Sequence, residues 1–240
     1  MRFSAKSAPS SDARRARAAR VVGLGLALLS LALAFASTRG FAPRAHAQPG
    51  AAPSVDALLH AFAAMPGLYA RFHEEKQIAL LSLPVESDGE IYFAPPDRLM
   101  RKVTSPIPSR ALLEGDRVTL VSPGERRVLD LGTSPVVRGF VGAFRDVLAG
   151  DRAALERSYH LDFSTEGEEF TLTLRPKRPA LARFLRELRL QGRAHSLTRL
   201  HMLETSGDVT DTTFTDVDPA RHYSSDDLAR LFTVGTVLSN

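Results

Sequence analysis

The stretch GEIYFAPPDRLMRKVT, residues 89–104, holds the pattern that decides the fold. Residues 89–94 are rich in the aromatic and β-branched side chains typical of a strand, and Pro95-Pro96 ends that strand. A second strand is predicted from Arg98 to Thr104, and Ser105-Pro106 ends it in turn. Because only a short turn joins the two strands, we expect them to pair antiparallel.

The strand pattern continues on both sides of this stretch. Before it, a segment that begins at Leu68 and includes Ile78 and Leu80 alternates in polarity, with Ala70 and Phe72 on one face. After it, turn residues separate further strands predicted at residues 110–113, 118–122, 127–131, 159–164, 170–175, 187–191, 197–204 and 211–215. About ten short strands with few helices indicate an α+β fold. We expect one strongly curved antiparallel β-sheet, an incomplete barrel with a few helices over its open, concave side.

Two longer helices interrupt the strand pattern. One begins after Ser54, an expected N-cap, and ends at residues 65–67; the other runs between Ser134 and Gly150. Shorter helical segments are predicted at residues 151–157, 180–185 and 226–232. Each long helix has one apolar face, so the two cannot cover both faces of so large a sheet. We expect them to lie on its concave side, where a cup could hold an apolar ligand.

Residues 1–47 have the organisation of a secretory signal peptide. Four arginines precede an apolar run from Val21 to Ala36, and Ala45-His46-Ala47 is a small-residue cleavage site. The apolar run is short for a permanent membrane span, although an uncleaved N-terminal anchor is the alternative. The predicted organisation is therefore a signal peptide at 1–47, a flexible leader at 48–53, a folded domain at 54–215, and a polar tail with a short helix at 216–240.

The charge of the chain changes when the signal peptide is set aside. The first 47 residues hold eight of the 31 basic residues and one of the 27 acidic ones. The remaining 193 residues, enough for one domain, therefore carry 23 basic and 26 acidic residues, a net charge near −3. Because a nucleic-acid protein keeps a basic surplus, we expect no nucleic-acid partner. The chain has no cysteine, which excludes disulfides, thiolate metal sites and a lipid-modified cysteine.

No catalytic or metal-binding motif is recognisable, so we expect no enzyme activity, no cofactor and no metal. His195 and His201 share a strand face, but no third metal ligand is near them in sequence. Glu74 and Glu75 are adjacent in a strand and should point to opposite faces, so they do not form a catalytic pair. Residues 216–218 resemble a fragment of a calcium loop without its glycine and distal glutamate, and are expected to form a turn.

Short motifs follow one another in an order that resembles the LolA-like periplasmic carriers of outer-membrane lipoproteins. The similarity spans roughly residues 55–215. Its first half holds Phe72–Lys76, the 89–93 strand, Pro96–Leu99, Pro106 and Gly115-Asp116, and its second half holds Leu148–Asp151, Leu172–Pro176 and Gly207-Asp208.

The resemblance implies a function in the periplasm. Such a carrier holds the acyl chains of a lipoprotein or lipid in an apolar cavity, and shuttles this ligand from an inner-membrane exporter complex to an outer-membrane acceptor. The alternatives are a carrier of a polyene or glycolipid in an export pathway, or a lipid-sensing regulatory subunit. We expect a monomer. Strand alternation does not fix which face is inward. The expected cavity lining is Phe72, Ile91, Phe93, Leu99 or Met100, Leu112, Leu120, Phe140 and Phe144.

Two positions depart from the pattern of the carriers that the sequence resembles. Those carriers have an arginine just before the proline that follows the second strand, where it ties down the lid, and this chain has Pro95. Their next strand holds a tryptophan where this chain has Arg101, and the chain has no tryptophan at all. We therefore expect a lid held mainly by apolar contacts. Residues 82–87, 96–99 and 148–155 look closer to a LolA-like subgroup linked to polyene or glycolipid export, so a lipoprotein and a non-protein lipid are both retained as candidate cargo.

Overall fold

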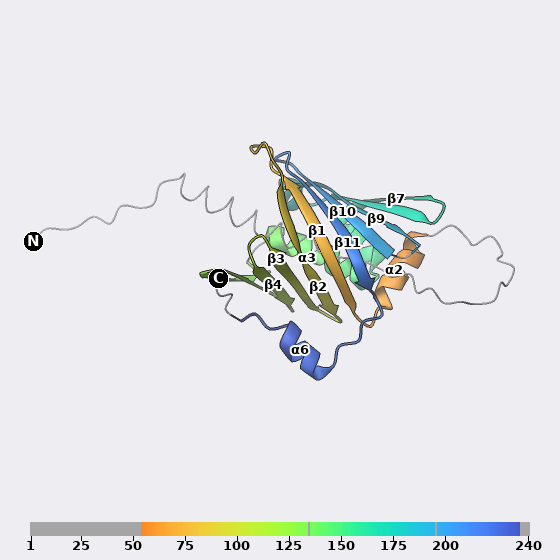
Figure 1. The fold of residues 1–240 in the computed structure, drawn as a ribbon. Helices are drawn as coiled ribbons and strands as arrows, with labels where there is room; N and C mark the ends of the chain where they lie inside the picture. The colour runs from red at the N-terminus through yellow and green to blue at the C-terminus, as the bar shows by residue number, and fades with distance from the viewer. Residues whose placement is uncertain (1–53, 134, 195, 236–240) are drawn as a thin grey trace, which may run out of the picture.

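The computed structural model describes residues 54–133, 135–194 and 196–235, and over these ranges one eleven-stranded antiparallel sheet forms the body of the protein (Figure 1). The sheet is not closed into a barrel, and helices lie on both sides of it. This confirms the α+β class and the incomplete barrel. The predicted signal peptide, the leader, the Ser134 cap and His195 lie outside the described residues.

The strands run in the order β6-β5-β4-β3-β2-β1-β11-β10-β9-β8-β7, so the pairing of β1 with β11 joins two meanders at the centre of the sheet. The N-terminal meander holds β1 (Leu68–Gln77), β2 (Val85–Ala94), β3 (Arg98–Ser105), β4 (Ser109–Glu114), β5 (Arg117–Ser122) and β6 (Glu125–Asp130). The C-terminal meander holds β7 (Tyr159–Glu166), β8 (Glu169–Pro176), β9 (Leu185–Arg193), β10 (Ser196–Glu204) and β11 (Val209–Asp218).

Several strand boundaries differ from the sequence-based expectation, and the ends of the first and last strands show why. The first strand ends at Gln77 instead of continuing through Leu80, and the Asp208 carboxylate accepts a hydrogen bond from the Ala79 amide at 2.9 Å just beyond it. The last strand reaches Asp218, because its final residues pair with the start of β1. Local periodicity does not predict either of these strand ends, because each depends on contacts with a segment more than a hundred residues away in the sequence.

The helices are α2 (Val55–Ala63), α3 (Pro135–Leu148), α4 (Arg152–Ser158), α5 (Pro179–Ala182) and α6 (Ser225–Leu231). The Ser54 hydroxyl accepts a hydrogen bond from the Ala57 amide at 3.1 Å, which confirms the expected N-cap. The Asp151 carboxylate caps α4 in the same way through the Ala154 amide at 2.8 Å. Between α3 and α4, Gly150 has a φ of +68°, a conformation that glycine adopts without strain.

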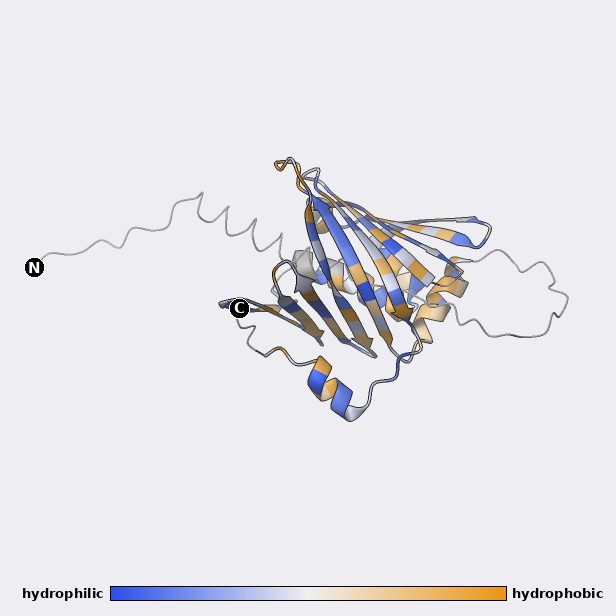
Figure 2. Ribbon diagram, viewed as in Figure 1, coloured by the Kyte–Doolittle hydropathy of each residue, from blue (hydrophilic) through white to orange (hydrophobic). Residues whose placement is uncertain are grey.

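The core lies between the concave face of the sheet and helices α2, α3 and α4 (Figure 1). Figure 2 shows the alternation of apolar and polar residues along the strands that gives each one a buried and an exposed side. From the helices, Leu59, Phe62, Phe144 and Leu155 are buried in this core. Sheet residues of both meanders meet them there, so a single apolar cluster joins the two halves.

The C-terminal segment is not a purely polar tail. After β11 the chain forms α6, which begins with a capping box between Ser224 and Asp227 and lies against the opposite, convex face of the sheet (Figure 1). Phe232 is buried in a second apolar cluster there, and the Tyr223 hydroxyl donates to the Leu68 carbonyl at 2.5 Å. Residues 216–232 are therefore packed on the folded domain.

Candidate functional site

The concave face brings together most of the residues predicted to line a cavity. Phe93 and Phe144 meet edge to face, with ring centroids 6.0 Å apart and an angle of 87° between the planes, which places α3 over β2. The members of the predicted set that are buried in this one cluster are Phe72, Ile91, Phe93, Leu99, Leu120 and Phe144.

Met100 and Leu112 lie on the other face. They are register partners on β3 and β4, and both pack with Phe232 in the cluster on the convex side. Consecutive residues of a strand point to opposite faces, so Leu99 on the concave side forces Met100 to the convex side. These two residues are therefore corrections to the predicted lining. The side chain of Phe140 lies outside what the structure describes.

Polar contacts hold α3 to the sheet in addition to the apolar ones. The Arg145 guanidinium donates to the Asp116 carboxylate at 2.9 Å, in the turn between β4 and β5. At the start of the helix, Arg138 donates to the carbonyl of Leu131 at 2.8 Å. The Tyr159 hydroxyl donates to the Gly139 carbonyl at 3.1 Å, and burial raises the pKa of this phenol, which keeps it a donor. The expectation of a helix held mainly by apolar contacts is therefore incomplete.

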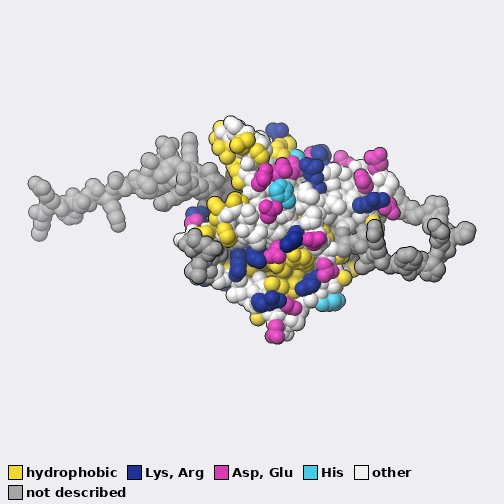
Figure 3. All heavy atoms as spheres, viewed as in Figure 1, with side chains coloured by type: hydrophobic (Ala, Val, Ile, Leu, Met, Phe, Trp, Pro, Cys, Tyr) yellow, Lys and Arg dark blue, Asp and Glu magenta, His cyan; other side chains and the backbone are white. Residues whose placement is uncertain are grey.

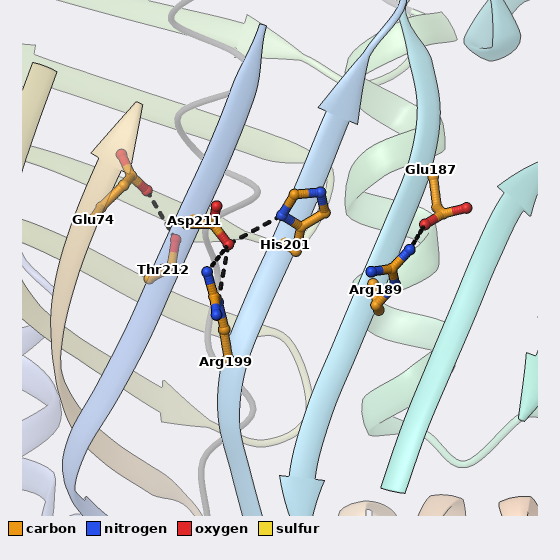
Figure 4. A network of polar contacts seen from close by, with 7 residues as sticks. All are labelled: Glu74, Glu187, Arg189, Arg199, His201, Asp211 and Thr212. Carbon is orange, nitrogen blue, oxygen red and sulfur yellow. Dashed lines mark hydrogen bonds and ion pairs between the residues drawn. The ribbon is translucent and has the colours of Figure 1, made fainter. Parts of the chain in front are cut away.

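A buried ion pair that the sequence analysis did not predict lies within the concave face. The Arg101 Nη2 atom on β3 is 3.0 Å from Glu74 Oε1 on β1. The Thr212 hydroxyl on β11 donates to Glu74 Oε2 at 3.3 Å (Figure 4). The Arg101 guanidinium stacks over the Phe72 ring, 4.4 Å from its centroid. The only signal in the sequence was that Glu74 and Phe72 share one strand face.

Gly89 makes this arrangement possible. It lies opposite Phe72 in the β1–β2 pairing, and an added Cβ would come within 2.6 Å of the Phe72 ring. The ring therefore lies flat over β2 because residue 89 has no side chain. Arg101 reaches over that ring towards Glu74. In the C-terminal meander, Gly192 lies opposite Phe170 in the β8–β9 pairing, and an added Cβ would come within 2.7 Å of the Phe170 ring.

A second ion pair lies further along the same face. The Lys76 ammonium donates to Glu204 Oε1 at 2.8 Å, and both side chains are largely buried. Thr210 pairs with Lys76 in the β1–β11 register, and its buried hydroxyl has no hydrogen-bond partner. The concave side is thus apolar towards α3 but carries a polar row across β3, β1, β11 and β10.

The convex face carries ion pairs that are exposed to solvent (Figure 3). The Asp211 carboxylate accepts hydrogen bonds from Arg199 at 2.9 Å and contacts the His201 ring nitrogen at 3.0 Å (Figure 4). His201 therefore has a carboxylate partner, and the described part of the chain contains no group of three or more potential metal ligands. Glu75, also exposed, faces away from Glu74 as expected from strand alternation.

Two further surface features lie away from the core. A hollow of about 720 Å³ on β7–β10 is lined mainly by polar and charged side chains, including Glu166, Arg193 and Arg199. The loop between β1 and β2 exposes Leu80, at 94% of its possible area, together with Leu81 and Leu83, and hydrophobic side chains gather there in Figure 3. No helix within the described ranges is long and apolar enough to cross a membrane.

Comparison with solved structures finds similar chains at low sequence identity. The LolA superfamily protein NE2245 from Nitrosomonas europaea is 12% identical, with a TM-score of 0.43, and the match covers 76% of this chain and 99% of that one. A putative outer membrane lipoprotein-sorting protein domain from Vibrio parahaemolyticus is 10% identical, with a TM-score of 0.44 and coverage of 73% and 95%. The MucA/MucB complex of Pseudomonas aeruginosa gives 14% identity, a TM-score of 0.45 and coverage of 71% and 57%.

The family comparison is more specific than these fold-level similarities. No curated protein sequence is detectably similar to the chain. The model of the family described as "Outer membrane lipoprotein carrier protein LolA-like" matches residues 47–230. This range runs from the predicted cleavage site to α6 and includes every strand of the sheet. Because the match extends over most of the chain, the protein belongs to the LolA-like family of outer-membrane lipoprotein carrier proteins.

Proposed function

We propose that this protein is a periplasmic carrier that holds the acyl chains of a lipoprotein or lipid against its concave face, and that it performs no catalysis. The carrier takes its cargo from an inner-membrane exporter complex and delivers it to an outer-membrane acceptor. The observation that carries the proposal is the concave apolar face, where Phe72 and Phe93 of the sheet share one apolar cluster with Phe144 of α3 in a chain of this family.

The physical requirements of such a carrier support the proposal. Each methylene group of an acyl chain loses about 0.8 kcal/mol in water relative to an apolar environment, so a lipid needs shelter between two membranes. Helix α3 buries Val141, Phe144 and Val147 in the core but takes no part in strand pairing, so a shift of the helix would leave the hydrogen bonds between strands intact. The exposed leucines at 80, 81 and 83 would suit approach to a lipid surface.

One observation favours a cargo other than a lipoprotein. Arg101 places a charged group inside the concave face where the lipoprotein carriers resembled by this sequence have a tryptophan. A lipid of the polyene or glycolipid class carries polar groups that a charged interior can contact. The second candidate is therefore a LolA-like carrier of a non-protein lipid in an export pathway.

Lipid binding is the direct test. The protein that begins at Gln48 should bind an environment-sensitive fluorescent fatty acid, and lipids extracted from the source membranes should displace it. Native mass spectrometry of the exported protein should identify the bound cargo, and N-terminal sequencing should find Gln48 or a neighbour as the first residue. A folded sample that binds none of these lipids would contradict the carrier function.

A further inference from the structure

Arg101 is in an unusual environment for a guanidinium group. Its exposed fraction is 5%, and its nearest described neighbours on the concave face are apolar except for Glu74. Burial lowers the pKa of Arg101, and the nearby Glu74 carboxylate opposes this shift. Burying a charge costs hydration free energy, so buried charged groups in folded proteins are normally paired and hydrogen-bonded.

The donors of Arg101 are not all used within the protein. Arginine has five N–H donors. The Nη2 atom is 3.0 Å from Glu74 Oε1, but this ion pair lacks the angles of a hydrogen bond, and both Nε and Nη2 are buried without an acceptor. Buried donors in folded proteins nearly always have a partner. Beyond the ion pair with Glu74, the described residues therefore leave part of the hydrogen-bonding capacity of Arg101 unused.

The space beside the guanidinium is bounded by apolar groups. The Phe72 ring covers one side of it. In the strand register, Arg101 lies between Ile91 on β2 and Ala111 on β4, and Ala111 is followed by Leu120 on β5. Ala111 is only partly buried, so solvent reaches the concave face at β4, next to the buried guanidinium. A ligand lying along β4 and β5 could therefore reach these donors.

The charge balance of the concave face decides which acceptor fits. Arg101 is matched by Glu74, and Lys76 is matched by Glu204, so the two ion pairs are neutral together. A ligand carboxylate or phosphate would add an unmatched negative charge in a poorly solvated place. A neutral carbonyl oxygen accepts the same hydrogen bonds without that penalty.

We propose that Arg101 is a polar anchor in the ligand site, where its free N–H groups donate to the neutral carbonyl oxygen of an acyl ester at the point where acyl chain and headgroup meet. The inference rests on the proposed function and deepens it by naming the ligand class. The ester can belong to a glyceride or to the diacylglyceryl group of a lipoprotein. A free fatty acid or a hydrocarbon lacks the required neutral carbonyl.

A set of three fluorescent ligands with the same pyrene-labelled chain tests the anchor. These are a methyl ester, the matching alkyl ether without a carbonyl, and the free carboxylate. The affinity of the unaltered protein for the ester should be at least about ten times its affinity for the ether. This is the effect expected for one hydrogen bond to a charged donor. The double variant Arg101→Met/Glu74→Leu removes both charges together and should bind ester and ether equally.

A second variant reverses the expected preference. Glu74→Gln keeps Arg101 but removes its counter-charge. The affinity for the carboxylate ligand, relative to the affinity for the ester ligand, should therefore rise at least about tenfold. The control is Arg98→Met/Glu114→Gln, which removes an exposed ion pair at 3.0 Å between β3 and β4 and should change no ratio of ligand affinities. Circular dichroism should verify that every variant is folded.

The outcomes separate this inference from the carrier function. If the unaltered protein binds none of the ligands, the carrier function fails. If it binds them but its ester-to-ether ratio persists in Arg101→Met/Glu74→Leu, the anchor is wrong and the carrier function stands. A synthetic diacylglyceryl-cysteine peptide and a diacylglycerol, tested as competitors, identify which source of the ester binds more tightly.

Discussion

Asp211 and Thr212 are consecutive residues of β11, yet they belong to two different electrostatic environments (Figure 4). Asp211 faces the convex side, where it contacts Arg199 and His201 in partial contact with solvent. Thr212 is fully buried on the concave side, where it donates to Glu74. One residue along the strand therefore separates an ordinary surface ion pair from the buried pair of Glu74 and Arg101.

The difference between the two faces indicates what each set of charges does. A solvent-exposed ion pair is easily formed and contributes little to folding, because water screens both partners. A buried pair loses hydration energy that the mutual attraction of its charges barely offsets. Stability alone does not explain why Glu74 and Arg101 lie within the apolar cluster, and this is why we propose a role for Arg101 in ligand binding.

The largest expected difference between the two faces is the loss of stability when one arginine is removed from each. Arg101→Met leaves the Glu74 carboxylate buried and unpaired, and should lower the free energy of unfolding by about 3–5 kcal/mol. Arg199→Met on the convex face should lower it by about 1 kcal/mol at most. Urea denaturation of both variants at neutral pH measures the difference. If Arg101→Met/Glu74→Leu recovers the lost stability, the loss in Arg101→Met comes from the unpaired Glu74 charge. Equal losses in Arg101→Met and Arg199→Met would contradict the expected difference between the two faces.

The two faces also offer a matched pair of phenylalanines. Phe144 meets Phe93 edge to face on the concave side, and Phe232 meets Tyr223 in the same geometry, at 5.5 Å and 89°, on the convex side. Phe144→Ala should destabilise the protein by about 3 kcal/mol, and Phe232→Ala by no more than that. Only Phe144→Ala should speed ligand dissociation, because only it loosens α3.

Stopped-flow displacement of a fluorescent lipid checks this difference. An unchanged dissociation rate in Phe144→Ala would mean that α3 is ordinary core and does not retain the ligand. An equal acceleration in Phe232→Ala would mean that the effect follows general destabilisation rather than the concave face.

The smallest expected effect is a pH dependence on the convex face. The hydrogen bond to Asp88, helped by the nearby charges of Asp88 and Glu75, raises the pKa of His73 above its usual value of 6.5 despite some desolvation. The protonated form is thus favoured in the folded state, so its contribution is complete below pH 6.5 and is lost as pH rises through the folded pKa. Because His73 is largely exposed, this contribution should stay below about 1 kcal/mol.

An NMR titration of the His73 ring measures that pKa directly. In Asp88→Asn it should fall towards the usual value, and the stability difference between the two proteins should be present at about pH 5.5 and nearly absent at about pH 8.5. A His73 pKa that does not respond to Asp88→Asn would contradict the assigned cause.

Much of the architecture could be read from local patterns. The strand that ends at Pro95-Pro96, the Ser54 and Asp151 caps and the turn at Gly150 depend on neighbouring residues, so the sequence predicts them correctly. The residues of the concave cluster were harder to predict. Periodicity paired Leu99 with Met100 as alternatives, and it could not state which of the two faces α3.

The sequence by itself determined the family and the alternation of its strands, because turn residues and side-chain polarity act over a few positions. Only the tertiary structure decided that Met100 and Leu112 face α6, that the C-terminal segment packs on the sheet, and that α3 has polar contacts. Likewise, only the pairing of strands β1, β2 and β3 brings Glu74 and Arg101 together across Gly89. Contacts between distant segments depend on strand register and sheet curvature, and these are settled when the whole chain packs around one core.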